Sequence, residues 1–201
     1  MFRAKDFQIV KSWRQRKIAK QVRNGIIPAG VSKEEIWAAL RETKPRGAAE
    51  MFGFLSAIVN NPDGTLKKDY GLVSVREVSS QFAGHLSAAM ASSATCVNDY
   101  NQHKMGAGST SETSDMTALV TPQAGAQAAG GQTAATKGAT SNIYRTIGTL
   151  TAGSAYGCRE HGVFNASTGG YLLDRSLVTN IDLNIDDVVT WTYELTINPG
   201  G

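Results

Sequence analysis

The most regular pattern in the chain is the alternation of apolar and polar residues between positions 188 and 197. Its apolar side chains share one face of an extended strand, and its Thr and Glu side chains share the other. The apolar set is Val189, Trp191, Tyr193, Leu195 and Ile197. A repeat of two residues over this length predicts a strand with one buried face and one solvent-exposed face. The threonine, valine and aromatic content favours the same conformation.

Other segments carry weaker forms of the same pattern. Residues 142–150, 155–165 and 170–178 are rich in apolar and β-branched residues and are separated by turn residues. Residues 70–78 predict another strand, 96–106 a less regular one, and 48–59 either a short helix or a buried strand. Several short strands in succession predict an antiparallel β-sandwich or jelly-roll.

Two segments near the N-terminus follow a helical period instead. Phe7, Val10, Trp13 and Ile18 are spaced three to five residues apart, which predicts an amphipathic helix that ends near Asn24 and Gly25. Residues 33–42 follow Ser32, and Glu35 three positions later completes a capping box. A second short helix is therefore expected there, stopped by the Lys-Pro-Arg-Gly sequence at 44–47.

These elements define the expected fold and its division into two parts. We expect a mainly β protein, with an antiparallel β-sandwich or jelly-roll-like body and a basic, partly helical N-terminal extension. Residues 1–69 would form the arm and short helices, and residues 70–201 the sandwich-like domain. Residues 106–141 are largely Gly, Ala, Ser, Thr and Gln, which bury little apolar area, so we expect long loops there.

Charge is distributed unevenly along the chain. Residues 1–23 hold eight Lys and Arg against one acid, a net charge of +7, whereas residues 24–201 carry a net charge of −4. Bases interleaved with aromatic residues suit a contact with an acidic partner. The candidate contact residues are Phe2, Phe7, Trp13, Arg14, Arg16, Lys17, Lys20 and Arg23.

Three roles for this basic segment remain open. Its aromatic residues could dock on a neighbouring subunit while its charges meet an acidic surface, which is the role we favour. It could fold back on its own domain. It could also bind nucleic acid phosphates, although the chain shows no motif for reading bases.

The segment from Arg159 to Val178 raises the question of catalysis, because it contains Glu160, His161, Asp174 and Arg175. Successive residues of a strand point to opposite faces, so Glu160 and His161 cannot line one pocket. A cross-strand ion pair of Glu160 with Arg159 or Arg175 is the simpler interpretation. The Gly169-Gly170 pair suits the turn of such a hairpin.

No other motif indicates chemistry. The three histidines and two cysteines show no metal-ligand spacing, and the Gly-rich stretch at 106–113 lacks the Lys-Ser/Thr of a phosphate loop. We therefore expect no catalytic residues, no cofactor and no metal. Cys96 and Cys158 are expected to be free thiols of a protein made in a reducing cytoplasm. No apolar run suggests a signal peptide or a membrane span.

The C-terminal half resembles a family of virion structural proteins from tailed bacteriophages. The matching pieces are "SNIYRTIGTLT", "REHGVFNASTGGYLLDRSLV" and "DDVVTWTYELTINPGG", and "HKMGAGSTSETSDMTALVTP" is similar to the segment that precedes them in the family. The resemblance runs from about His103 to Gly201, and its motifs are structural. It implies a β-sandwich-like building block of a phage particle without enzymatic activity.

From this resemblance we expect a capsid decoration or cement protein of the virion. Its partners would be the major capsid protein or other virion subunits, including further copies of itself, and no membrane. A tail, neck or fibre-attachment component is an alternative in the same class. A DNA-binding protein that uses the basic arm is an alternative of a different class.

Overall fold

The computed structural model describes residues 4–43, 50–92, 99–137 and 140–198. These residues form a mainly β fold with three helices. In chain order the elements are α1 (Ala4–Arg23), α2 (Lys33–Glu42), β1 (Glu50–Asn60), β2 (Leu66–Glu77), α3 (Ser80–Ala91), β3 (Gln102–Gly106), β4 (Pro122–Ala129), β5 (Gly131–Lys137), β6 (Thr140–Thr151), β7 (Tyr156–Phe164), β8 (Leu172–Leu183) and β9 (Val188–Asn198). All the predicted C-terminal strands are present.

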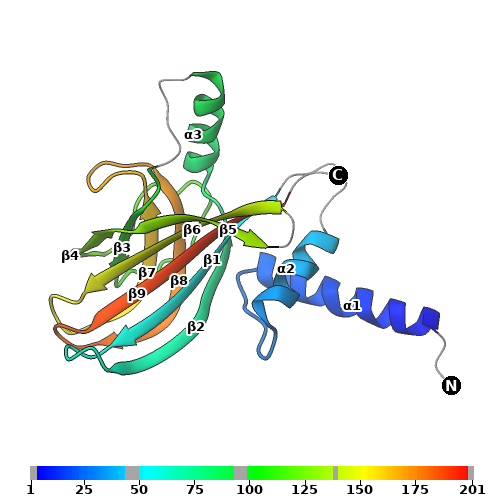
Figure 1. Ribbon diagram of the computed structural model, residues 1–201, viewed down its shortest axis with the longest axis horizontal. Helices are drawn as coiled ribbons and strands as arrows, with labels where there is room; N and C mark the ends of the chain where they lie inside the picture. The colour runs from blue at the N-terminus through cyan, green and yellow to red at the C-terminus, as the bar shows by residue number, and fades with distance from the viewer. Residues whose placement is uncertain (1–3, 44–49, 93–98, 138–139, 199–201) are drawn as a thin grey trace.

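The strands form two antiparallel sheets. One sheet has the order β2-β1-β9-β6-β5, and the other has the order β4-β3-β7-β8. Strand β9 lies at the centre of the first sheet, where Trp191 is opposite Ala57 of β1 on one side and Gly148 of β6 on the other. Figure 1 shows the two sheets as layers, with α1 extending away at one end and α3 projecting at another side.

The main core lies between the two sheets. Trp191 and Tyr193 of β9, Leu55 of β1, Met105 of β3 and Leu173 of β8 are all fully buried in it. Complete burial of a large apolar side chain stabilises the folded state by roughly 1.5–3 kcal/mol. Because both sheets contribute to one core, neither is expected to be stable without the other.

A second core lies on the outer face of the five-stranded sheet. Ile18 and Val22 of α1 and Ile36 of α2 pack there against Phe52 and Phe54 of β1. The predicted capping box begins α2, since Glu35 N–H donates to Ser32 Oγ (3.1 Å) and Ser32 N–H donates to Glu35 Oε2 (3.2 Å). The helix pair therefore covers one end of this sheet face.

Because the helix pair covers this sheet face, the burial of alternate residues along β9 differs from the expected pattern. Residues 189, 191, 193 and 195 are buried as predicted, but Glu194 and Thr196 are also buried, at 3% and 2% exposure. Ile197, expected on the buried face, is 39% exposed. The prediction of a wholly solvent-exposed second face was wrong because α2 lies over it, and Lys33 forms an ion pair with Glu194.

The expectation of long loops over 106–141 holds for only part of that range. Residues 107–121 form an irregular connection, but Pro122–Ala129 and Gly131–Lys137 are strands. Small side chains do not prevent strand formation, because the hydrogen bonds come from the backbones of β3 and β6. The larger residues of neighbouring strands supply the apolar core, so β4 and β5 need little of their own.

The predicted boundary between residues 69 and 70 falls inside β2. Residues 48–59 were compatible with either a short helix or a buried strand; residues 50–60 form strand β1, which lies between β2 and β9. Residues 50–77 therefore belong to the five-stranded sheet.

Candidate functional site

The C-terminal half of α1 is fixed to the body, and the N-terminal half extends beyond it (Figure 1). Ile18, Ala19 and Val22 are buried in the outer core. The helix ends as predicted, since Gly25 has a φ of 76° and its N–H donates to Val22 O (2.8 Å). One of the three roles considered for the basic segment was packing against its own domain. The last turns of α1 pack in this way.

The opposite face of α1 is basic and solvent-exposed. It carries Trp13, Arg16, Lys17 and Lys20, which occupy positions i, i+3, i+4 and i+7 of one helix face and are all exposed. Trp13 is 64% exposed, and the Lys17 ammonium lies 5.6 Å from the centre of its ring. Tryptophan and arginine are among the residues most enriched at the energetic centres of protein contacts, so this combination suits a contact region.

The other two bases of the predicted set contact their own domain. Arg14 forms an ion pair with Glu35 of α2 (3.0 Å), and both side chains remain exposed to solvent. Arg23 binds Glu50 Oε1 (2.9 Å) and Thr43 Oγ1 (3.0 Å), which joins the end of α1 to the start of β1. Arg23 is therefore a structural residue.

The two phenylalanines of the set cannot be placed in this way. Phe2 lies outside the described residues, and Phe7 lies within α1 but its side chain is also outside what the structure describes.

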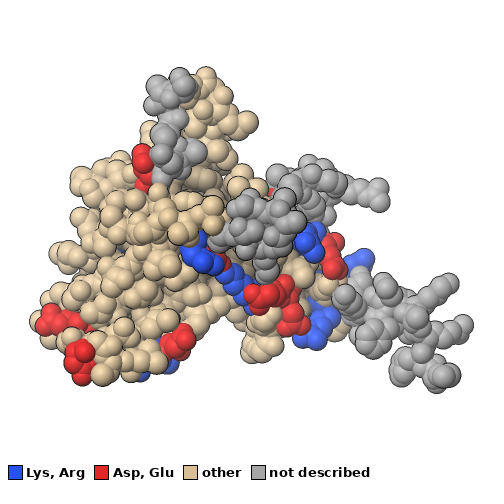
Figure 2. Space-filling model, viewed as in Figure 1, with Lys and Arg blue, Asp and Glu red and all other residues tan. Residues whose placement is uncertain are grey.

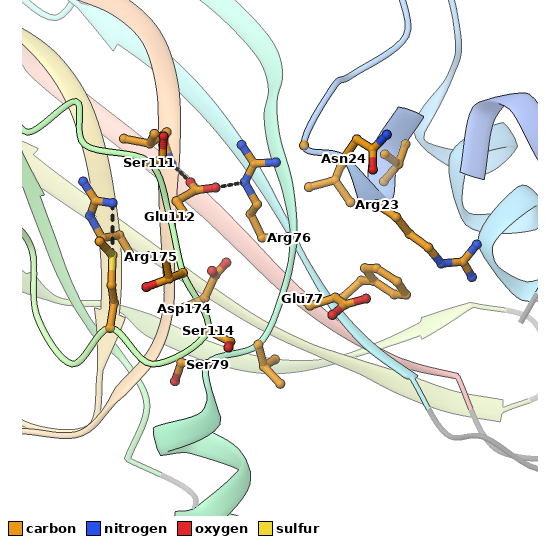
Figure 3. Close-up of a pocket in the computed structure, with 18 of the residues that line it drawn as sticks. Arg23, Asn24, Arg76, Glu77, Ser79, Ser111, Glu112, Ser114, Asp174 and Arg175 are labelled. Carbon is orange, nitrogen blue, oxygen red and sulfur yellow. Dashed lines mark hydrogen bonds and ion pairs between the residues drawn. The ribbon is translucent and has the colours of Figure 1, made fainter. Parts of the chain in front are cut away.

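A cleft of about 490 Å³ lies where β2 of one sheet meets β8 of the other, below the end of α1. Figure 3 shows Arg76 of β2 and Glu112 of the 107–121 connection pointing toward each other in this cleft. They form an ion pair, and Glu112 also accepts a hydrogen bond from the Leu177 backbone N–H of β8. The carboxylate thus joins the edges of two sheets that are not paired to each other.

Asp174 lies on the β8 wall of this cleft and is buried. Burial, and then the charge of Glu112, raise the pKa of Asp174 to about 7, although Ser176, Arg76 and Tyr193 oppose the shift. Ser176 Oγ donates to Asp174 Oδ2 at 3.2 Å. This carboxyl therefore changes protonation near neutral pH while it is enclosed by protein.

The hairpin of β7 and β8 contains the predicted cross-strand ion pair, but it is buried. Arg175 Nε lies 2.7 Å from Glu160 Oε2, and neither side chain is exposed by more than 2%. Burial raises the pKa of Glu160, but hydrogen bonds from Val120 and Thr121 N–H and from Arg175 outweigh it and hold this pKa below its ordinary value. Of the two partners that the sequence allowed for Glu160, the structure selects Arg175, and the 107–121 connection covers the pair.

Glu160 and His161 lie on opposite faces of β7, as the strand period predicts. The His161 ring contacts Trp191 of the facing sheet, with ring centres 4.6 Å apart. Its Nε2 lies 3.0 Å from His103 Nδ1, and His103 Nε2 lies 3.1 Å from Thr146 Oγ1. Burial lowers the pKa of both histidines, so they are neutral members of the core at physiological pH.

The remaining chemical groups are consistent with packing roles. Cys158 is a free, buried thiol whose pKa burial raises to about 12, so it is protonated and unreactive; Cys96 lies outside the described residues. Across the described ranges, no group of three or more His, Cys, Asp or Glu side chains is arranged to hold a metal ion. No helix in these ranges has the length and apolar character to cross a bilayer.

Sequence reasoning identified the basic segment, three of whose bases share an exposed face of α1, but it did not predict the cleft. Arg76, Glu112 and Asp174 come from segments far apart in the chain, and only the meeting of β2 with β8 brings them together. The sequence indicated Asp174 only as a polar residue of the 159–178 segment, and no local signal links it to Arg76 or Glu112. The one partial clue was the acid at position 112 inside a segment otherwise poor in charge.

Comparisons with protein-family models, with curated proteins and with solved structures found no match to this chain. The functional argument therefore depends on the site geometry and on the sequence motifs.

Proposed function

We propose that this chain is a non-enzymatic structural protein of a tailed-phage virion, a capsid decoration or cement protein that contacts neighbouring subunits through α1. The observation that carries the proposal is the exposed basic face of α1, which includes Trp13 beside Arg16, Lys17 and Lys20, on a helix whose other face is anchored. An anchored helix can bind a partner without the entropic cost of ordering a free arm.

The rest of the molecule suits this role. In the body, Glu160, Arg175, Glu194 and Asp187 are buried and form ion pairs within the chain. The two sheets would act as a rigid, jelly-roll-like sandwich. The C-terminal motifs that resemble phage virion proteins supply the class, and the partners would be the major capsid protein or other virion subunits.

The test is occupancy on particles. Phage particles assembled without this protein are incubated with the wild type or with the Arg16→Glu/Lys17→Glu variant, and bound protein is measured by gel densitometry. Reversing two charges at the contact should reduce occupancy at least about tenfold, since each close charge pair contributes on the order of 1 kcal/mol.

A matched control carries the same change in net charge elsewhere. Arg41→Glu/Lys104→Glu alters α2 and β3 and should leave occupancy unchanged. Equal occupancy for all three proteins would refute the proposal. The copy number per particle separates a decoration protein, present over the whole shell, from a tail, neck or fibre-attachment component, present at one vertex.

DNA binding is the second candidate, and the exposed bases of α1 favour it as well. Contacts by Arg16, Lys17 and Lys20 with three phosphates would give a slope of about −2.7 for log affinity against log salt. A filter-binding series at several salt concentrations measures this slope. A flat response, or no binding at low salt, excludes this role.

A further inference from the structure

The end of the body opposite α1 carries a surface of the opposite charge. It is formed by the β1–β2 turn and the β8–β9 turn, which lie side by side because Asn60 of β1 pairs with Val188 of β9. Figure 2 shows acidic side chains at this end, far from α1. We call this region, the two turns with the strand ends beside them, the acidic tip. It consists of Asp63, Leu66, Lys67, Lys68, Asp69, Asp182, Ile185 and Asp186, so its exposed acids outnumber its two lysines.

The carboxylates of the acidic tip are available to a partner. All four are exposed, and three of them accept hydrogen bonds from uncharged groups: Asp63 from Thr65 N–H (2.9 Å), Asp69 from Gly71 N–H (2.8 Å) and Asp182 from the Asn180 amide. These bonds fix the side chains without neutralising them. Asp187, by contrast, is buried and paired with Lys67.

Two exposed apolar side chains stand among these acids. Leu66 is 63% exposed and Ile185 is 60% exposed. Within the acidic tip, Lys67 is paired with the buried Asp187, and the Lys68 ammonium lies 4.3 Å from the centre of the Tyr70 ring.

On α1, where side chains are described from residue 13 onward, Trp13 is 64% exposed and lies near Arg16, Lys17 and Lys20. Each surface therefore combines exposed apolar side chains with an excess of charge of one sign, and the two signs are opposite. Contacts of this kind combine apolar burial with electrostatic pairing.

One molecule cannot use both surfaces on itself. Figure 1 shows α1 extending from the body at the end farthest from the β1–β2 and β8–β9 turns. A second copy can use them, because its acidic tip presents the complement of the first copy's α1. We propose that the exposed face of α1 binds the acidic tip of another copy of this chain, head to tail.

This inference rests on the proposed function in taking α1 as the contact surface, and it names a second copy as the partner. Because the two surfaces differ, the contact is heterologous, and repeated contacts produce rings or open chains of subunits. The surfaces are small, so the association should be weak and should require high protein concentration or a template.

Sedimentation equilibrium of the purified full chain tests the contact. We expect association at about 10 mM salt, where the Debye length is about 30 Å, and monomers at about 1 M salt, where it is about 3 Å. Arg16→Glu/Lys17→Glu and Asp69→Lys/Asp182→Lys should each raise the apparent dissociation constant at least about tenfold. The Arg41→Glu/Lys104→Glu control should associate like the wild type.

Mixing the two reversed variants provides the decisive measurement. Each variant alone has a head and a tail of the same sign, but an equimolar mixture pairs acidic heads with basic tails and basic heads with acidic tails. The mixture should regain association. A thermal melt of each variant confirms that it is folded.

Three results would overturn the inference: a wild type that stays monomeric at low salt, association that survives both reversals, or a mixture that remains monomeric. The proposed function can fail separately. If self-association follows the predictions but particle occupancy does not depend on Arg16 and Lys17, only the virion role is refuted. If occupancy depends on them and the free chain does not associate, only the head-to-tail contact is refuted.

Discussion

The buried carboxylate of Glu160 shows how a charged residue can be part of a core. Besides Arg175, it accepts hydrogen bonds from the backbone N–H groups of Gly108 (3.1 Å), Val120 (3.0 Å) and Thr121 (2.6 Å). These bonds hold the irregular 107–121 connection against the outer face of β7. Glu160, which the sequence offered as a candidate catalytic acid, thus anchors a long loop.

Glu160→Gln tests this role. The substitution keeps the shape but leaves the Arg175 guanidinium buried without its counter-charge, so the free energy of unfolding should fall by roughly 3–5 kcal/mol. Urea denaturation followed by fluorescence measures the change. The double variant Glu160→Gln/Arg175→Met should recover part of the loss, because no unpaired charge remains. A loss below about 1 kcal/mol in the single variant would contradict the assignment.

Asp174 predicts a dependence of stability on pH. Its pKa is about 7 in the folded protein and close to 3.8 when exposed, so the folded state binds the proton more tightly. Stability from this group is complete below about pH 4 and is lost as the pH rises toward 7, at up to about 1.4 kcal/mol per pH unit. Above pH 7 the contribution is constant.

The comparison of wild type with Asp174→Asn isolates this effect. Asn cannot ionise, so the variant should gain stability relative to the wild type as the pH rises from 4 to 7. Urea denaturation at several pH values measures the difference, and the contribution of Glu160 cancels because both proteins contain it. A constant difference across this range would show that Asp174 has an ordinary pKa.

At the scale of the elements, a helix or strand could be predicted when the residues that determine it lie within its own segment of the sequence. The helix at 33–42 was predicted with its cap because Ser32 and Glu35 contain the whole signal. The strand at 188–197 was predicted because alternation is also local. The strands at 122–129 and 131–137 were missed, since their partners β3 and β6 determine them.

The same distinction applies to the candidate site. Composition alone revealed the basic face of α1, whereas the division of α1 into an anchored and an extended half depends on the distant Phe52 and Phe54. The acidic tip could not be predicted, because it joins two turns separated by about 120 residues along the chain.

Gly148 of β6 offers a test of how β6 packs against the other sheet. A Cβ atom at this position would lie 2.4 Å from His103 Cγ, so the small residue allows the histidine to lie against the strand. Gly148→Ala should lower the free energy of unfolding by about 1–3 kcal/mol through overpacking. Gly131→Ala in β5 is the control, because nothing lies within 4 Å of its Cβ, and it should change stability by less than about 0.5 kcal/mol. Chemical denaturation measures both, and equal effects would contradict the close packing.

At the scale of the whole molecule, α1 has two roles: one part of the helix is buried against the body, and another part presents exposed side chains. The last turns of α1 complete the outer core through Ile18, Ala19 and Val22, while Trp13, Arg16, Lys17 and Lys20 are exposed. Truncation should separate these functions, since tolerance to deletion follows burial.

Deleting residues 1–12 should leave the melting temperature nearly unchanged, because Figure 1 shows the first turns of α1 extending beyond the body and, from residue 13 onward, where burial is described, the buried residues of α1 begin at Ile18. Deleting residues 1–24 removes Ile18, Ala19 and Val22 and exposes Phe52 and Phe54, which should cost several kcal/mol and lower the melting temperature by about 10 °C. Differential scanning calorimetry measures both. Similar melting temperatures for the two truncations would mean that α1 contributes nothing to the outer core.

Strand β9 occupies the middle of its sheet, hydrogen-bonded to β1 on one side and β6 on the other, yet the ribosome makes it after the eight other strands of these two sheets. Until β9 has been synthesised, β1 and β6 each have an edge without its hydrogen-bonding partner, and the other apolar residues of the main core cannot pack against Trp191 and Tyr193. The native sheet can therefore assemble only after translation has passed residue 198, and a nascent chain that stops a dozen residues earlier should have no native state to reach.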